Sequence, residues 1–421
     1  MMNRRQFLTS ALGLTGASML TSRAGLASMA ESSERNFIFV FAQGGWDPTR
    51  VFAPEFSNAS VSMEWDAEVN QIGDLEWVSH SERPSVDAFF ESHYDQTLLI
   101  NGVQVRSIAH EICTSLLFTG GVSGDSADWA TRIASETQRS MAIPHLVLGG
   151  PSFAGDLGAM VVRTGSSNQL EDVLNRNILT RSNDEVPLLS TPSQDVLDRY
   201  VQQRVHAKAN QAHYGADLKL STAYKTAMDN AMELKNRRHT MTFTSGSLSN
   251  QLSCAVDAIA KGVSRCASVV YTGDNGLGWD SHADNDATQS SLFEGLFAGL
   301  NQLMHQLEVR VDTAGQSLLE NTTVVVCSEM GRTAMLNGTS GKDHWPFTSL
   351  MVLGAGITGN RVIGGFDSGY QGHRIDLASG DTTDFGQVLS IESVGAGLLA
   401  LAGLDPAEHV LDAAPLIGML S

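Results

Sequence analysis

Basic residues are scarce in this sequence, which holds 27 lysines and arginines against 46 aspartates and glutamates and carries a net charge of −19. Three of the basic residues and none of the acidic ones lie among the first 30, so the remainder is more acidic still. This balance argues against a general binder of nucleic acid or of anionic membranes. If a small anion is the substrate, a local cation such as a bound metal ion must attract it.

Cysteine and long apolar runs are scarce too. The four cysteines form no CxxC pair, so we expect free, buried thiols rather than a disulfide framework or a thiol-metal site. Beyond residue 30 no stretch approaches the ~20 consecutive apolar residues of a membrane-spanning helix, so we expect no stable membrane insertion. The 40 glycines follow no period, which excludes a coiled coil or collagen, and the 42% of hydrophobic residues is enough for a large packed core.

The first 30 residues resemble a twin-arginine export signal. The pair Arg4-Arg5 is followed by a mildly apolar run to Leu20 and the small-residue end Ser28-Met29-Ala30. The alternatives are a general secretory signal or an arginine-rich helix start. We expect residues 1–30 to be removed after export through the twin-arginine translocation machinery. Residues 31–421 would then form one domain in the periplasm or outside the cell.

Six short apolar runs rich in β-formers predict strands that are buried on both faces. They span residues 36–42, 97–100, 145–148, 267–271, 322–327 and 350–353. Helical periodicity occurs between them, at about residues 195–209, 215–236, 246–263, 287–310 and 389–403. Strands that alternate with long helices predict the α/β class, with a mostly parallel central sheet flanked by helices on both faces. Residues 151–245 hold few strand-like runs, so we expect a helical insertion or cap there.

Acidic residues and histidines follow several of these strands, at the edge of an open α/β sheet where ligands bind. Asp47 follows Gly44-Gly45 at the end of the first strand, and Asp280 and His282 follow the strand at 267–271. Residues two apart in an extended segment point the same way. Asp280 and His282 can therefore converge on one ion.

Three further candidates complete the set. Glu329 follows the strand at 322–327, and Asp343 and His344 lie in the loop at 337–346. Each alone is also explained as a turn-former, a helix cap or a chance Asp-His pair, but four carboxylates and two imidazoles together favour a metal centre. Such ligands favour zinc or manganese, with iron or calcium as alternatives. Because six ligands exceed one tetrahedral site, we expect one or two divalent ions.

Four segments occur in the order of the motifs of a known family. They are Phe39–Asp47, Gly278-Trp279-Asp280-Ser281-His282, Ser328-Glu329-Met330-Gly331-Arg332-Thr333 and Gly341-Lys342-Asp343-His344. In them the chain resembles the domain-of-unknown-function family 1501, exported proteins in the alkaline phosphatase-like superfamily, which also contains sulfatases and phosphodiesterases. The resemblance covers roughly residues 36–405 and implies a metal site built from the six candidates above. It departs at Trp345, where family members commonly have glycine, and at Ser126–Trp129, which matches loosely.

The residue that attacks a substrate is less well defined. In sulfatases and nucleotide pyrophosphatases of that superfamily the nucleophile opens a helix nine residues before a Thr-Gly pair, and Thr119-Gly120 points back to His110. The resemblance makes His110 a transient phosphohistidine, a general base or another ligand. Ser107 is the hydroxyl alternative and Thr114 a weaker one. A helix cap at Ser107 and an interfacial histidine at His110 are the structural explanations.

Two basic residues lie close to the candidate ligands in the sequence. Arg332 follows Glu329 in the same loop, where it would either clamp a phosphate or sulfate oxygen or bridge to a nearby acid. Lys342, beside Asp343, is expected to be solvated.

These features predict an exported metal-dependent hydrolase of phosphate or sulfate esters whose substrate is a small anionic ester. The metal would polarise the ester oxygen and activate water or a hydroxyl, with catalytic roles for His110, Ser107 and Arg332. The alternative is a non-catalytic exported metal-binding protein that serves as a partner on the same scaffold. The lack of an obvious Ser, Thr or Cys nucleophile favours that alternative.

Overall fold

The computed structural model describes residues 34–165, 169–175, 189–237, 241, 243, 246–273, 278–410 and 412–421. The predicted signal peptide lies outside the described residues. Within them the main sheet has the strand order β12-β4-β11-β8-β1-β7-β5-β6. Its strands are β1 (Asn36–Ala42), β4 (Thr97–Gln104), β5 (His145–Val147), β6 (Val161–Arg163), β7 (Cys266–Tyr271), β8 (Thr322–Cys327), β11 (Phe347–Gly354) and β12 (Arg361–Gly364).

Smaller elements complete the fold. Three two-stranded ladders are β2 (Glu68–Ile72) with β3 (Leu75–Ser79), β9 (Gly331–Arg332) with β10 (His344–Trp345), and β13 (Arg374–Ile375) with β14 (Gln387–Val388). The helices are α2 (Pro84–His93), α3 (His110–Thr119), α4 (Trp129–Ser135), α5 (Gln169–Asn175), α6 (Thr191–Gln211), α7 (Gly215–Arg237), α8 (Leu248–Ala260), α9 (Asn285–Val309), α10 (Leu318–Asn321) and α11 (Ile391–Leu401). Short 3-10 turns are η1 (Pro48–Arg50), η2 (Tyr94–Gln96), η3 (Gly158–Met160), η4 (Pro406–Glu408) and η5 (Ile417–Met419).

Strand direction decides which loops meet at one edge of the sheet. All pairings of the main sheet are parallel except those of β11, which runs antiparallel to both β8 and β4. The beginning of β11 therefore lies at the same edge as the ends of β1, β7 and β8. This reversal brings the loop that precedes β11 to the carboxyl ends of the parallel strands, where α/β proteins bind their ligands.

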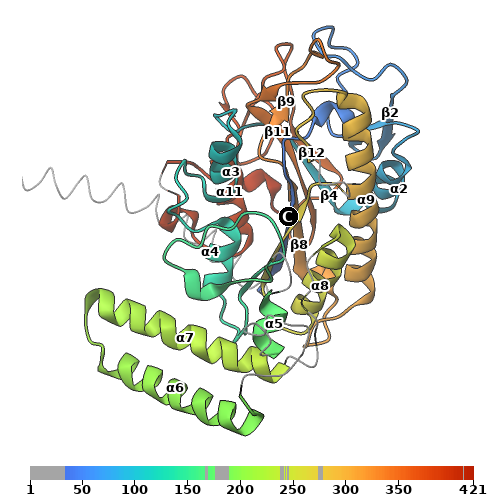
Figure 1. Cartoon of the computed structure of the whole chain (residues 1–421). Helices are drawn as coiled ribbons and strands as arrows, with labels where there is room; N and C mark the ends of the chain where they lie inside the picture. Colours follow the sequence, from blue (N-terminus) through green and yellow to red (C-terminus); the bar gives the residue numbers. More distant parts are fainter. Residues whose placement is uncertain are drawn as a thin grey trace, which may run out of the picture.

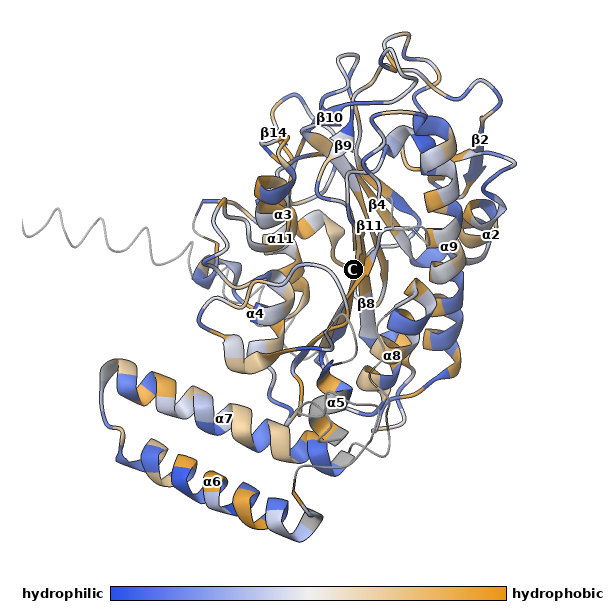
Figure 2. Ribbon diagram, viewed as in Figure 1, coloured by the Kyte–Doolittle hydropathy of each residue, from blue (hydrophilic) through white to orange (hydrophobic). Residues whose placement is uncertain are grey.

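The sheet is covered on both faces, as Figure 1 shows. Alternate residues of β1 point to opposite faces: Ile38 and Val40 pack with α2, α8 and α9, whereas Phe37 and Phe39 pack with α3, α4 and α11. Every residue of β1 is buried, which explains its unbroken apolar sequence. Figure 2 shows the same hydrophobic centre between polar outer surfaces. The predicted α/β class and mostly parallel sheet are confirmed.

Residues 151–245 contribute mainly helices to the described structure. The long helices α6 and α7 pack against each other, and Figure 1 shows this hairpin projecting below the sheet. The same segment also supplies β6, which pairs with β5 at the sheet edge. The segment is therefore attached to the sheet through an edge strand that the sequence patterns did not predict.

Two further observations concern the cysteines and the length and hydropathy of the helices. All four cysteines are buried, and Cys113, Cys266 and Cys327 are free thiols, as expected from their spacing. Among the described helices, none combines the length and the apolar character that a membrane crossing requires.

Candidate metal centre

The candidate residues gather where four segments meet at the carboxyl edge of the sheet. Asp280 and His282 follow β7, and Glu329 follows β8. His344 opens β10 just before β11, and the ladder between β9 and β10 pairs it with Arg332. His110 is the first residue of α3, a helix that starts after the extended residue Ala109 and ends at left-handed Gly120.

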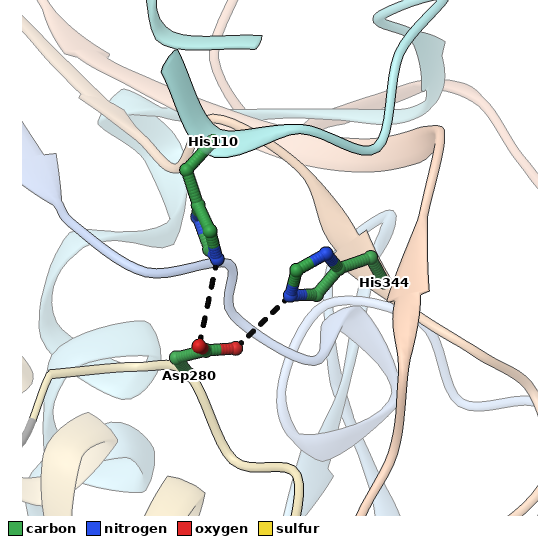
Figure 3. Close-up of side chains that lie close together, drawn as sticks. All are labelled: His110, Asp280 and His344. Atoms are coloured by element: carbon green, nitrogen blue, oxygen red, sulfur yellow. Dashed lines mark hydrogen bonds and ion pairs between the residues drawn. The ribbon is translucent and has the colours of Figure 1, made fainter. Parts of the chain in front are cut away.

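Two imidazoles and one carboxylate form the tightest part of the cluster. The Nε2 atoms of His282 and His344 lie 3.0 Å apart, and each lies 3.1 Å from Oδ1 of Asp280. The Nε2 atom of His110 approaches the other oxygen of Asp280, at 3.5 Å. Figure 3 shows His110, from α3, and His344, from β10, directed at Asp280. His110, Asp280 and His344 place ligand atoms within 4.8 Å of one another.

The Nδ1 atoms of the three imidazoles all face oxygen acceptors. His110 Nδ1 lies 2.8 Å from Glu329 Oε1, His282 Nδ1 lies 2.9 Å from Asp343 Oδ1, and His344 Nδ1 lies 2.8 Å from the Ile108 carbonyl oxygen. A proton on each Nδ1 satisfies these contacts, so each neutral ring carries its lone pair on Nε2. Three lone pairs and a carboxylate then face one another. A cation between them would satisfy all of these atoms.

Glu329 is held rigidly behind His110. Its carboxylate is 1% exposed and accepts hydrogen bonds from the Gly44 backbone N–H at 2.9 and 3.0 Å. The hydrogen bond to Glu329 is the main cause that raises the pKa of His110, although burial lowers it. Glu329 therefore orients the ring and makes its free nitrogen more basic. Asp343 orients the ring of His282 from a more exposed position.

Arg332 fixes Asp280 from inside the protein. Its side chain is fully buried and donates to Asp280 Oδ1 at 2.7 Å and to the Gly45 carbonyl oxygen at 2.8 Å. It also donates to the carbonyl oxygens of Gly44, Lys342 and Trp279. Burial raises the pKa of Asp280, but the hydrogen bond and charge of Arg332 lower it to about 2. Of the two roles expected for Arg332, the structure shows the bridge to an acid.

Asp47 lies in a separate, buried group of charges. Its carboxylate is 2.8 Å from Lys342 Nζ and accepts hydrogen bonds from Thr49 and Asn285. The five other predicted ligands are linked through His110, His282 and His344. Within the described residues, the hydrogen bonds and ion pairs of Asp47 do not reach them. The expectation that Lys342 is solvated is wrong, because its side chain is fully buried.

Ser107 occupies the turn before α3. Its hydroxyl accepts a hydrogen bond from the Ala109 N–H at 3.2 Å, so it braces the start of the helix that carries His110.

An open pocket of about 580 Å³ lies beside the cluster, and His110, Thr114, Asp280 and Glu329 are among its lining residues. Trp345 turns away to donate to the Tyr370 carbonyl oxygen at 2.7 Å.

Polar residues of α9 support the site, and sequence reasoning missed them. Gln289 Nε2 donates to the Trp279 carbonyl oxygen and to Ser281 Oγ, on either side of Asp280. Asn285 accepts from Ser281 Oγ. Both residues are fully buried and stand four apart, in line with the apolar face of the helix. A polar pair on the buried face of an amphipathic pattern was the signal that could have found them.

The residues of the cluster fit a divalent cation. His110 Nε2 is buried without a hydrogen-bond partner, which is costly unless a ligand satisfies it. Metal-binding histidines typically use one ring nitrogen on the ion and donate the other N–H to a carboxylate or a carbonyl. His282 and His344 have that arrangement. Imidazole and carboxylate donors suit zinc or manganese.

The fold and the site together define a mostly parallel α/β protein with an imidazole and carboxylate cluster at the carboxyl ends of its strands. The chain belongs to the family described as "Protein of unknown function (DUF1501)", whose model matches residues 34–409. The family expected from the motifs is confirmed. Among curated proteins, none matches this chain.

Several solved structures are similar in overall arrangement. The lipoteichoic acid synthase LtaP from Listeria monocytogenes is 8% identical with a TM-score of 0.42, over 93% of this chain and 77% of that one. The PsFucS1 sulfatase from Pseudoalteromonas sp. is 10% identical with a TM-score of 0.39, over 100% and 77%. A protein in the alkaline phosphatase superfamily from Vibrio parahaemolyticus is 9% identical with a TM-score of 0.35, over 89% and 68%. With scores this low, the fold assignment rests on the sheet topology itself.

Proposed function

We propose that this protein is an exported metal-dependent hydrolase of phosphate or sulfate esters. The observation that carries the proposal is the convergence of His282 Nε2, His344 Nε2 and Asp280 Oδ1 within 3.0–3.1 Å of one another. These three residues would hold a divalent ion, zinc or manganese by their chemistry. A bound ion would polarise the ester and lower the pKa of water.

The pocket itself explains why an anionic substrate would need the metal. Among the described residues, its lining includes the carboxylates of Glu111, Asp280 and Glu329, and no lysine or arginine. Without a cation this lining repels an anionic ester. Divalent ions in the cluster would reverse the local charge, even in a protein whose net charge is −19.

His110 is the residue that we propose acts on the substrate. Its Nε2 atom stands apart from the tight trio of Asp280, His282 and His344, at 3.5 Å from Asp280 Oδ2. The residue also lines the pocket. With its Nδ1 proton held by Glu329, Nε2 can accept a proton from an attacking water. Alternatively, it can attack the phosphorus or sulfur atom, so that the bond to the alcohol oxygen breaks and the alcohol leaves. Glu329 would stabilise the positive charge that the ring gains in either case.

Export is part of the proposal and rests on the sequence of the first 30 residues. Replacement of Arg4 and Arg5 by lysine should leave the precursor in the cytoplasm, as cell fractionation would show. Unchanged export of that variant would point to a general secretory signal instead.

The test of the hydrolase proposal combines metal analysis with a substrate panel. Protein purified without chelator is analysed for metals and assayed against aryl phosphate, phosphodiester and sulfate substrates. Asp280→Asn and His344→Ala should lose metal and turnover together, whereas His305→Ala, at an exposed histidine of α9, should keep both. Wild-type protein without bound metal would overturn the proposal. Bound metal with no turnover would favour the non-catalytic metal-binding protein, which the bracing role of the Ser107 hydroxyl also supports.

A further inference from the structure

The buried pair of Asp47 and Lys342 has no role in the chemistry proposed above. Both side chains are fully buried, and Lys342 Nζ lies 2.8 Å from Asp47 Oδ2 and 3.0 Å from Thr49 Oγ1. Asp47 follows β1 in the sequence, whereas Lys342 immediately precedes Asp343 and His344. The contact therefore joins two loops that are far apart in the chain and adjacent at the edge of the sheet.

The carboxylate of Asp47 has no acceptor site left for a metal ion. Its Oδ1 atom accepts from the Thr49 N–H at 3.1 Å and from the Thr49 hydroxyl at 2.7 Å. Its Oδ2 atom accepts from Lys342 Nζ and from Asn285 Nδ2 at 2.9 Å. A carboxylate offers about four lone-pair sites, and all four are taken. The lysine ammonium is the nearer of two buried cations beside this carboxylate, because Arg50 Nε lies 3.7 Å from Oδ2.

The backbone of Lys342 is fixed as firmly as its side chain. Its N–H donates to the Ser281 carbonyl oxygen at 3.0 Å, and its carbonyl oxygen accepts from Arg332 Nη1 at 3.2 Å. Ser281 lies between two proposed ligands, and Arg332 holds Asp280. Lys342 thus lies in the loop that carries His344 and contacts the loop that carries Asp280 and His282.

Hydrogen bonds through two residues of α9 link Asp47 to the loop that carries Asp280 and His282. The backbone N–H of Asp47 donates to Gln289 Oε1 at 3.0 Å, and Gln289 holds the Trp279 carbonyl oxygen. Its carboxylate accepts from Asn285, which in turn accepts from Ser281 Oγ. Both routes end at residues beside Asp280. The pair therefore spans the two loops whose spacing sets the distances in the candidate centre.

We infer that Lys342 is a permanent internal cation for Asp47, and that the pair is a positioning device for the loops that carry Asp280, His282 and His344 rather than part of the metal centre. This inference rests on the proposed function. Asp47 is then not a metal ligand, although its place after β1 suggested one. The number of ions that the protein binds is then set without Asp47.

The test compares Asp47→Asn, Lys342→Met and the double variant in the full chain. Each protein is titrated with zinc alone and with manganese alone, and the number of bound ions, the affinity and the unfolding midpoint are measured. All three variants should bind the same number of ions as wild type. Each single variant should bind them about 10-fold more weakly, as losses behind metal ligands do. Each should also unfold more easily, because it buries a charge that has lost its direct partner.

The double variant separates positioning from ligation. Removal of both charges should restore much of the unfolding midpoint that either single variant loses, while the affinity stays below that of wild type because the loops are no longer tied. As a matched control, Lys225→Met and Asp229→Asn remove an ion pair of the same 2.8 Å length whose side chains are about one-third exposed. These control variants should change neither the metal affinity nor the unfolding midpoint. If a single variant does not fold, the double variant still reports the number of ions.

Three results would overturn the inference. Asp47→Asn or the double variant could bind one ion fewer than wild type, which would make Asp47 a ligand. Lys342→Met could bind one ion more, which would make the lysine a stand-in that a metal displaces. The double variant could unfold as easily as the sum of the singles predicts, which would show that the two charges are not coupled. The unfolding cycle gives its answer even if the wild type binds no metal, so failure of the proposed function would be recognised separately.

Discussion

Each imidazole of the candidate centre is oriented by the acceptor that its Nδ1 atom meets. Glu329, Asp343 and the Ile108 carbonyl oxygen fill that role for His110, His282 and His344. The predicted ligands therefore have two different roles. Asp280, His282 and His344 would contact the ion, while Glu329 and Asp343 would act through a histidine.

The role of His110 is tested by its replacement with alanine. We expect His110→Ala to lose turnover about 100-fold or more, the range of a general acid–base group, while the metal content stays near that of wild type. The reason is that the tight trio does not include His110. Parallel loss of metal and activity would make His110 a ligand, and full activity with full metal content would leave Ser107 and Thr114 as the next residues to examine.

A second prediction concerns His145, far from the candidate centre. Its ring is fully buried between the hydroxyls of Thr131 and Ser268, and burial lowers its pKa. The unfolded chain therefore takes up a proton below about pH 6.5 that the folded protein resists. Stability should fall as the pH drops from 7.5 to 5, and His145→Gln should lose less stability over that range.

Urea unfolding at several pH values measures this effect. His305→Gln, at an exposed histidine, is the control and should follow the wild-type curve. If His145→Gln and wild type lose the same stability between pH 7.5 and 5, the buried ring does not cause the pH dependence.

At the residue scale, the sequence predicted which side chains gather but not how they divide their roles. Asp280, His282 and His344 were found because strand ends and motif order mark them. Asp47 carries the same mark, yet its partner is the ammonium group of Lys342, from a loop far along the chain. A lysine beside an Asp-His pair in a polar loop looks solvated, and only the packing of that loop onto β1 reveals its burial.

At the scale of secondary structure, unbroken apolar runs made the central strands easy to predict. β8 spans the predicted residues 322–327, and α7 lies within a residue of its predicted bounds. The direction of β11 was not predictable in this way, because an apolar strand has the same composition in a parallel and in an antiparallel neighbourhood. That direction is what brings His344 to the site. The short strands β6 and β12 were missed because they are only partly buried.

The contact between α11 and α4 allows a test of the packing on the face of the sheet that α3, α4 and α11 cover. A Cβ atom at Gly395 of α11 would overlap the ring of Trp129, which is itself buried in α4. Gly395→Ala should therefore destabilise the protein by about 1–3 kcal/mol through overpacking. Gly158→Ala, where no neighbour lies within 4 Å, is the matched control. Equal unfolding midpoints for the two variants in urea would contradict the packing described.

At the scale of the whole molecule, one edge of the sheet collects most of the buried and half-buried charge described above. The imidazole cluster lies there beside an open pocket, and the Asp47 and Lys342 pair lies behind it. The α6 and α7 hairpin projects below the sheet (Figure 1). Under the proposed function, this edge of the sheet carries the chemistry.

The central claim, that Asp280, His282 and His344 bind a divalent ion, is tested most directly by anomalous X-ray diffraction from crystals of protein loaded with zinc or manganese. We expect an anomalous peak about 2.0–2.6 Å from Asp280 Oδ1 and the two Nε2 atoms. We also expect the peak to disappear in Asp280→Asn. Loaded crystals without a peak among these atoms, or with a peak bound by other residues, would contradict the account.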